Sequence, residues 1–278
     1  MIADLLTKIF KRGKLRQEYI DFLCSQSESY MHNAFTSSEY DTIKNYQVYE
    51  FLGDSVINNF VPYYFFRKYP QLHCDEGVKV LNRLKANFVS CRSLASIANS
   101  LGFWPYIRCH NKNNITPQKK NDLLEDVFEA FFGFTVWLLD EEYSIGVGPG
   151  LVYDILEDIF DDIPVSLEYD DLYDAKARLK ELFDHYPTEL GLFKRNKDRN
   201  TPANLYIHHE YNKVVFRHRA PGTSSKLQKN IPVEIGVAEG NGTHADREQE
   251  ASRQALEYFK QKGIVYKNEI QIFCEKIR

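Results

Sequence analysis

The sequence predicts an all-α domain followed by a small α+β domain with the element order α-β-β-β-α. From Leu5 to about Ile163, apolar residues recur at spacings of three and four, which is typical of amphipathic helices. Beyond an acidic segment that contains Pro164, three short strand-like segments stand between two helical ones. We therefore expect one domain over residues 1–163, an exposed linker over 164–171 and a second domain over 172–278.

Turn-forming residues divide the helical part. Breaks are expected at Tyr69-Pro70, from Gly102 to Pro105, from Asn111 to Pro117 and from Gly146 to Pro149. The most apolar run, Phe131 to Leu139, is too short to cross a bilayer and indicates a buried helix. The first ten residues show no signal-peptide pattern, so neither a leader nor a membrane partner is expected.

The spacing of apolar residues changes in the second domain. Helices are expected over residues 173–185 and 245–262, and Gly263 should end the second one as a left-handed cap. Strands are expected over residues 205–210, 213–219 and 231–237, with a tight turn at Tyr211-Asn212 between the first two. Such a chain should form a small antiparallel sheet with the helices on one face.

The formal net charge of −4 is unevenly distributed along the chain. Residues 1–169 carry −7 and residues 170–278 carry +3, so attraction for phosphate groups is expected in the second part. The cysteines form no close pair, which indicates free thiols in a reducing compartment and an intracellular protein of the cytoplasm or nucleus. The five cysteines are Cys24, Cys74, Cys91, Cys109 and Cys274.

Two pairs of carboxylates stand out in the helical part. Glu50 and Asp54 are four residues apart, and Asp126 and Glu129 are three apart, so each pair shares one helix face. Both pairs lie in apolar segments without lysine or arginine, so both helices are expected to be largely buried. Buried carboxylates require a cationic partner, for which Mg²⁺ is suited. Two solvated acidic helix faces would give the same spacing, but the apolar setting favours a metal site. The eight histidines show no metal-ligand spacing, and His208-His209 are expected to be structural or surface residues.

The residues around these carboxylates resemble motifs of the ribonuclease III family. Glu50-Phe51-Leu52-Gly53-Asp54-Ser55 is similar to the signature hexapeptide of that family, and Asp126-Val127-Phe128-Glu129-Ala130 is similar to its second motif. Shorter similarities lie at Ala34-Phe35-Thr36 and Asp75-Glu76-Gly77. The C-terminal part resembles the double-stranded-RNA-binding domain that follows the nuclease domain in this family, so the resemblance extends over nearly the whole chain.

The resemblance implies a double-strand-specific endoribonuclease. Glu50, Asp54, Asp126 and Glu129 match the catalytic metal ligands, and Glu76 matches an acidic residue near a second metal. The expected ion is Mg²⁺, with Mn²⁺ as an alternative. Phe51 matches an aromatic knob that enters a socket on the partner subunit of a homodimer, and the alternative is an ordinary core phenylalanine. Members of the family leave 5′-phosphates and two-nucleotide 3′ overhangs.

Some positions depart from the family pattern. Gln47 stands where the family often has Glu, and His244-Ala245-Asp246-Arg247 replaces the lysine pair that usually opens the second helix of the RNA-binding domain. RNA-binding roles are therefore expected for His244 and Arg247, together with Arg178 and Glu181 on the first helix, where polar side chains meet 2′-hydroxyls. Weak, shape-based RNA binding is predicted, and a domain kept as a scaffold is the alternative.

Two functional hypotheses follow. The first is an active dimeric enzyme that cleaves double-stranded RNA by Mg²⁺-dependent phosphodiester hydrolysis, in which metal ions activate water and neutralise charge on the phosphate. The second is a non-catalytic double-stranded-RNA-binding or scaffold protein of the same fold. The presence of all four carboxylates favours the enzyme, because nothing else requires them in apolar surroundings.

Overall fold

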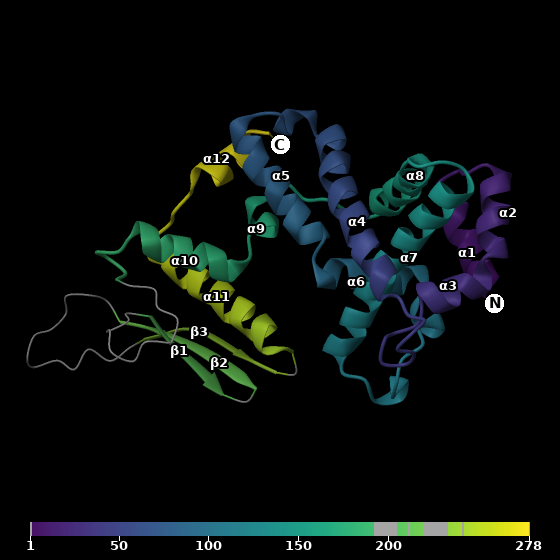
Figure 1. Ribbon diagram of the computed structural model, residues 1–278. Helices are drawn as coiled ribbons and strands as arrows, with labels where there is room; N and C mark the ends of the chain where they lie inside the picture. Colours follow the sequence, from purple (N-terminus) through teal and green to yellow (C-terminus); the bar gives the residue numbers. More distant parts are fainter. Residues whose placement is uncertain (1, 192–204, 211, 220–232, 241, 278) are drawn as a thin grey trace, which may run out of the picture. The chain divides into compact units, whose positions relative to one another are not determined.

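The computed structural model describes residues 2–191, 205–210, 212–219, 233–240 and 242–277 (Figure 1). The chain divides into two compact units, Met1–Val165 and Ser166–Arg278. Within the described residues, no helix has the length and apolar character needed to cross a membrane. All five cysteines are free thiols, as expected.

The first unit is helical, as the three- and four-residue spacing of apolar side chains predicts. Its α-helices are α1 (Ile2–Phe10), α2 (Gln17–Ser25), α3 (Ser27–Asn33), α4 (Gln47–Lys68), α5 (Asp75–Phe88), α6 (Cys91–Leu101), α7 (Pro117–Glu142) and α8 (Val147–Asp161). Short 3₁₀ turns lie at Pro70–Leu72, Trp104–Tyr106 and Lys112–Asn114. Two predicted breaks coincide with helix ends, because α4 stops before Pro70 and Gly102 ends α6 in the left-handed region with a φ of 88°. The break predicted from Gly146 to Pro149 is placed too late, because α7 ends at Glu142 and α8 already begins at Val147.

Helix α7 lies at the core of the first unit. Thr116 caps it by accepting a hydrogen bond from the Lys119 amide, and Pro117 occupies its first turn. Most side chains from Leu123 to Leu139 are buried, as expected of a helix that is apolar on all sides. The ring of Phe131, for example, packs at a centroid distance of 5.2 Å from that of Phe103. Helix α7 therefore provides rigid support for the carboxylates along it.

The second unit combines helices with a three-stranded antiparallel sheet. Its elements are α9 (Tyr169–Leu172), α10 (Ala175–His185), β1 (Leu205–Glu210), β2 (Lys213–His218), β3 (Val233–Glu239), α11 (His244–Gln261) and α12 (Glu269–Lys276). The strand order is β1-β2-β3, and α10 and α11 cover one face of the sheet (Figure 1). Tyr211 of the predicted turn and residues 231–232 of the predicted third strand lie outside the described residues.

The core of the second unit lies between the sheet and these two helices. Phe183 of α10 and Phe259 of α11 are buried in the same cluster as Phe216 of β2. Gly236 allows α11 to approach β3, because a Cβ atom at this position would lie 2.1 Å from the carbonyl oxygen of Ala251. Gly263 follows α11 with a φ of 76°, in agreement with its predicted role as a helix end.

The sequence pattern does not predict α9 and α12. Helix α9 begins within the expected linker over residues 164–171, and Tyr169 is buried, so this part of the segment is not an exposed linker. Asn268, which caps α12, donates hydrogen bonds to the Tyr169 hydroxyl at 2.7 Å and to Glu181 Oε2 at 2.9 Å. These contacts hold both short helices to α10, and they join residues that are far apart in the sequence.

Candidate active site

The two helices that carry the predicted carboxylates, α4 and α7, contact each other backbone to backbone. A Cβ atom on Gly53 would lie 1.8 Å from the carbonyl oxygen of Glu129, so a larger residue does not fit at this point. Gly53 directly precedes Asp54 and follows Glu50 by three residues. The glycine contact therefore brings the carboxylate pair of α4 to the pair of α7.

The four predicted carboxylates differ in their burial. Glu129 is buried, with 9% of its surface exposed, whereas Glu50 and Asp126 are half-buried and Asp54 is exposed. Asp54 accepts a hydrogen bond from Asn58 Nδ2 at 2.6 Å. The cluster thus has a buried side on α7, while solvent reaches it at Asp54 on α4.

Burial and mutual repulsion make these carboxylates hold their protons more tightly. Burial, followed by the charges of Asp54 and Glu125, raises the pKa of Glu129 to about 8. Burial, followed by the charges of Asp126 and Glu125, raises the pKa of Glu50 to about 7. Since each helix shifts the pKa of a carboxylate on the other, the predicted residues share one electrostatic site.

Two residues that the sequence analysis does not identify belong to this cluster. Glu125 lies four residues before Glu129, and burial and the charge of Asp126 raise its pKa. Tyr46, which is buried and precedes α4, donates a hydrogen bond from its hydroxyl to Asp126 Oδ2 at 2.7 Å. The helical spacing could have identified Glu125, whereas the contact of Tyr46 spans 80 residues of sequence and has no local signal.

The cluster fits a hard divalent cation. Burial raises the pKa of Asp126 despite the opposing Tyr46 hydrogen bond and the charge of Lys119, and Lys119 is itself paired with Glu39 at 3.1 Å. Carboxylate oxygens are the ligands that Mg²⁺ prefers, and Glu50, Asp54, Asp126 and Glu129 could hold such an ion. Within the described part of the chain, these oxygens do not all lie within 4.8 Å of one another.

The structure does not bring Glu76 into this cluster. Glu76 is exposed in the first turn of α5, and no described contact joins it to the carboxylates of α4 and α7. The expectation that Glu76 lies near a second metal ion therefore stays a prediction.

One face of α4 is open to solvent. Phe51 is 78% exposed and Val48 is 74% exposed, whereas Gly53 and Ile57 on the same helix are buried. The expectation that the helix of Glu50 is largely buried is therefore wrong for this face, because only one side of α4 packs against its neighbours. Within this chain, Phe51 is not a core residue.

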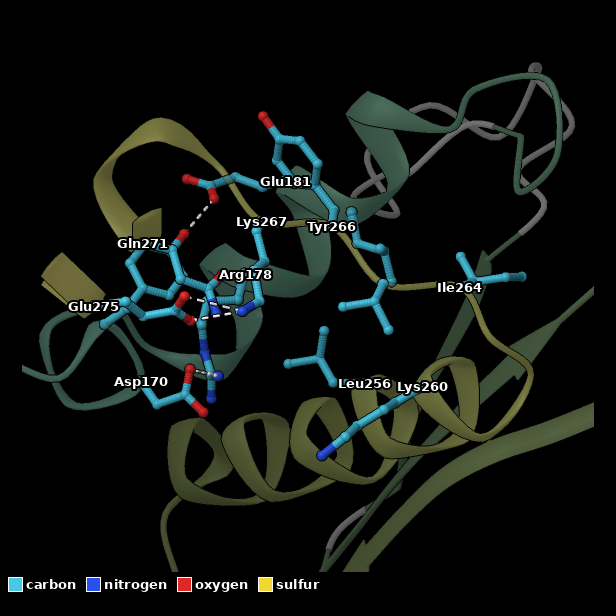
Figure 2. A pocket seen from close by; sticks show the side chains of 13 residues that line it. Asp170, Arg178, Glu181, Leu256, Lys260, Ile264, Tyr266, Lys267, Gln271 and Glu275 are labelled. Carbon is cyan, nitrogen blue, oxygen red and sulfur yellow. Dashed lines mark hydrogen bonds and ion pairs between the residues drawn. The ribbon is translucent and has the colours of Figure 1, made fainter. Parts of the chain in front are cut away.

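The side chains predicted to bind RNA make contacts within the second unit. Arg178 forms an ion pair with Asp170, and Glu181 accepts a hydrogen bond from the Tyr169 hydroxyl at 2.5 Å. Arg178 and Glu181 line a pocket together with Leu256 of α11 and Tyr266 (Figure 2), and the volume of this pocket is about 400 Å³. Both side chains are thus held toward α9 and the segment before α12.

His244 and Arg247 lie in the first turn of α11. Nε2 of His244 is 2.6 Å from Nδ1 of His209 on β1. The Arg247 guanidinium donates hydrogen bonds to the carbonyl oxygen of Gly240 at 3.0 Å and to that of Gly242. Arg247 therefore closes the turn before α11, and this leaves less of its hydrogen-bonding capacity for a phosphate than the sequence position suggests.

This chain is similar to known proteins of one family. Residues 47–138, which include all four predicted carboxylates, match the ribonuclease III domain family model. Two viral relatives carry the name "Putative ribonuclease 3". The one from Frog virus 3 (isolate Goorha) is 36% identical over 263 residues, which cover 94% of this chain and 62% of that protein. The one from Invertebrate iridescent virus 6 is 32% identical over 256 residues, which cover 87% of this chain and 82% of that protein.

A solved structure is also similar to part of this chain. The nuclease domain of ribonuclease III from Campylobacter jejuni aligns with 57% of this chain and 96% of that chain, with 25% identity and a TM-score of 0.43.

The match to the ribonuclease III domain identifies the class of this protein, which is a ribonuclease. Since the similarity to the Invertebrate iridescent virus 6 protein extends over 82% of that protein at 32% identity, the chain belongs to the ribonuclease III family.

Proposed function

We propose that this chain is an endoribonuclease that cleaves double-stranded RNA by metal-dependent phosphodiester hydrolysis at the α4–α7 carboxylate cluster. The observation that carries the proposal is the backbone contact at Gly53, which brings Glu50 and Asp54 beside Asp126 and Glu129. All four carboxylates lie inside the segment that matches the ribonuclease III domain, which supports the assignment.

The proposed metal ligands are Glu50, Asp54, Asp126 and Glu129, with Mg²⁺ as the expected ion and Mn²⁺ as an alternative. When bound, such an ion lowers the pKa of a water molecule and neutralises charge that develops on the phosphate. Tyr46 acts as a positioning residue, because its hydroxyl bonds to Oδ2 of Asp126 and fixes the rotamer of that carboxylate. Glu129 is held on the buried side of the cluster by α7, so its carboxylate has little freedom to move away.

The second unit is proposed to be a double-stranded-RNA-binding domain with the order α10-β1-β2-β3-α11. Two helices on one face of an antiparallel sheet support this, as does the net charge of +3 over residues 170–278. Arg178, Glu181, His244 and Arg247 are the side chains proposed to meet RNA. Because each already makes contacts within the unit, we expect weak binding that depends on duplex shape.

The enzyme is proposed to act as a homodimer. Phe51 and Val48 expose apolar side chains on α4 next to Glu50. Burial of this apolar surface against another protein chain would be favourable. A twofold contact would bury the same patch on both copies. Two active sites, one in each subunit, would then cut one strand each and leave 5′-phosphates and two-nucleotide 3′ overhangs.

A cleavage assay on the full chain tests the proposed function. Duplex RNA, one of its strands alone and duplex DNA of the same sequence are incubated with MgCl₂ or with EDTA. The proposal predicts cleavage of duplex RNA only, and only with the metal ion, to products with 5′-phosphate ends. Cleavage in EDTA, or equal cleavage of the single strand, would contradict it. Binding of duplex RNA without any cleavage would favour the non-catalytic alternative.

A further inference from the structure

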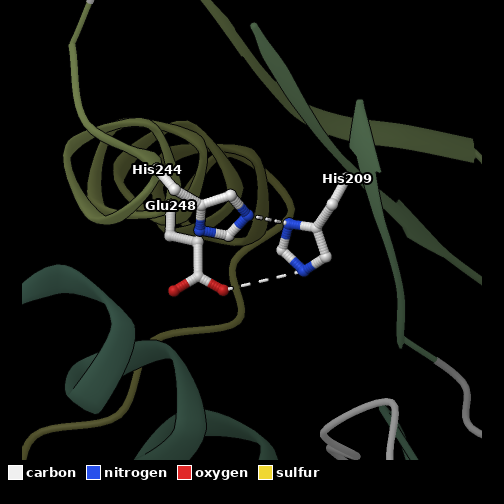
Figure 3. Close-up of side chains that lie close together, drawn as sticks. All are labelled: His209, His244 and Glu248. Carbon is white, nitrogen blue, oxygen red and sulfur yellow. Dashed lines mark hydrogen bonds and ion pairs between the residues drawn. The ribbon is translucent and has the colours of Figure 1, made fainter. Parts of the chain in front are cut away.

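A second group of potential metal ligands lies in the second unit, separate from the carboxylates of α4 and α7. His209, His244 and Glu248 offer ligand atoms that all lie within 4.8 Å of one another. Figure 3 shows the two imidazole rings side by side, with the Glu248 carboxylate beside them. Nε2 of His244 is 2.6 Å from Nδ1 of His209, and Nε2 of His209 is 3.8 Å from Oε1 of Glu248.

The local structure explains why these side chains meet. Thr243 caps α11 and forms a reciprocal capping box with Asp246, which fixes the first turn of the helix and His244 within it. Glu248 follows His244 by four residues and therefore lies on the same helix face, one turn further along. His209 comes from β1, where it pairs with Val214 of β2. The backbones of His209, His244 and Glu248 are thus all fixed by a helix or a strand.

We propose that His209, His244 and Glu248 form a binding site for Zn²⁺ or a similar borderline-soft divalent ion. Two imidazole nitrogens and one carboxylate oxygen are a common ligand set for Zn²⁺, with a water molecule at the fourth position. Mg²⁺ prefers oxygen ligands only, so the site differs in metal preference from the α4–α7 cluster. The side chain of His209 is 35% exposed, which leaves a route for an ion to enter from solvent.

A positively charged side chain lies beside the site. Lys176 of α10 forms an ion pair with Oε2 of Glu248, and the Lys176 and Glu248 side chains are 19% and 15% exposed. With Oε2 engaged by Lys176, Oε1 is the oxygen of Glu248 that lies near His209. The ion pair also restrains the carboxylate, as residues that contact a metal ligand usually do. The lysine charge also opposes a cation, so we expect a site of moderate affinity.

Metal binding would connect β1 to α11. An ion that binds only the folded second unit should raise the melting temperature of that unit. Binding requires one nitrogen of each ring to face the ion without a proton, so the ion would replace the hydrogen bond between His244 and His209. That hydrogen bond alone, without an ion, would not make the melting temperature depend on Zn²⁺.

The test measures binding of ZnCl₂ to the full chain by calorimetry in the presence of excess MgCl₂, which occupies oxygen-only sites. One equivalent of Zn²⁺ should bind to the wild type, and His209→Gln or His244→Gln should weaken this binding by at least about tenfold. His110→Gln, which changes an exposed histidine of the first unit, serves as the matched control and should bind like the wild type. Zn²⁺ should also raise the melting temperature of the wild type and the control, but not of the two site variants.

Several results would overturn the proposal. The proposal is wrong if the wild type binds no Zn²⁺, or if His209→Gln and His244→Gln bind Zn²⁺ as tightly as the wild type. It is also wrong if the His110→Gln control loses as much Zn²⁺ affinity as these two variants. X-ray absorption of the zinc-loaded wild type gives a second measurement that does not depend on how the variants fold. The proposal predicts two imidazole ligands per zinc ion, and a spectrum with only oxygen ligands would contradict it.

Discussion

Gly133 of α7 lies directly against Gly53 of α4. A Cβ atom on Gly133 would fall 2.6 Å from the Gly53 nitrogen and 2.1 Å from the carbonyl oxygen of Tyr49. These distances are shorter than van der Waals contact, and the obstructing atoms belong to backbone that cannot rotate away. The pair of glycines therefore determines how closely the helices approach, and with it the separation of Glu50 from Asp126 and Glu129.

Replacing Gly133 with alanine should separate the two helices. We expect Gly133→Ala to lose at least about 2 kcal/mol in free energy of unfolding, because overpacking a buried contact forces the backbone to shift. Cleavage activity should be lost with it. Gly150→Ala is the matched control, since Gly150 lies in α8 with nothing within 4 Å of its Cβ position. Urea unfolding measures both variants, and a Gly133→Ala protein as stable and active as the wild type would refute this role of the contact.

The raised pKa of Glu129, about 8 in the folded chain, has a consequence for stability in metal-free buffer. The folded state holds this proton more tightly than the unfolded state, where a glutamate releases it near pH 4.5. Unfolding free energy should therefore fall as the pH rises through this interval. Glu129→Gln should reduce that fall, because the amide has no proton to lose. Urea unfolding in EDTA at about pH 5 and about pH 8 measures the difference.

The control for this experiment is Glu141→Gln, an exposed position on the same helix. Glu141→Gln should keep the pH dependence of the wild type. Part of the dependence should also remain in Glu129→Gln, because burial and the neighbouring carboxylates raise the pKa of Glu50 to about 7. An identical pH dependence in the wild type and Glu129→Gln would show that Glu129 is not held in a proton-retaining environment.

Local patterns predict the elements and the carboxylate pairs, because both depend on spacing within one helix. Glu50 and Asp54 share a helix face regardless of which element packs against α4. Gly263 ends α11 because glycine readily adopts the left-handed backbone conformation. The hydrogen bond from Tyr46 to Asp126 could not be predicted in this way, because it exists only once α4 and α7 have packed. The same reason applies to His209 and His244, which are 35 residues apart.

Burial is the property that the sequence predicts least well. The apolar residues around Glu50 indicate a buried helix, yet Phe51 is exposed, since a sequence pattern cannot distinguish a core face from an exposed apolar face. Helix α9 is missed for the opposite reason. Its four residues include Asp170 and Asp171, and this acidic composition indicates an exposed segment. Tyr169 and Leu172 are nevertheless buried.

Phe51→Glu should disrupt the proposed dimer. A carboxylate in a covered apolar contact costs desolvation energy and repels its symmetry mate, so we expect a monomer at micromolar concentration in sedimentation velocity. Ile145→Glu is the control, because Ile145 is 94% exposed and lies outside α4. A monomeric wild type with full activity, or a Phe51→Glu variant that remains dimeric, would exclude this interface.

The second unit should contribute only modestly to phosphate contacts. Its net charge is small, and Arg247 already bonds to two backbone carbonyls. When the logarithm of the RNA-binding constant is plotted against the logarithm of the salt concentration, the unit should therefore add a slope on the order of one to three. Removing residues 166–278 should leave cleavage of duplex RNA at low salt, and Arg247→Ala should weaken binding slightly and equally for all sequences. Binding measured against salt tests this, and a slope change of five or more would identify a strong clamp in this unit.

The most direct measurement for the account as a whole is the single-turnover cleavage rate of duplex RNA in MgCl₂ by the wild type, Asp126→Asn, Glu129→Gln and Glu141→Gln. Loss of one proposed ligand should reduce the rate by at least about a hundredfold, because the metal supplies both the activated water and the charge stabilisation. Glu141→Gln should cleave like the wild type, and circular dichroism should show all four proteins folded. A folded Asp126→Asn or Glu129→Gln protein that cleaves at the wild-type rate would contradict the assignment of the active site to α4 and α7.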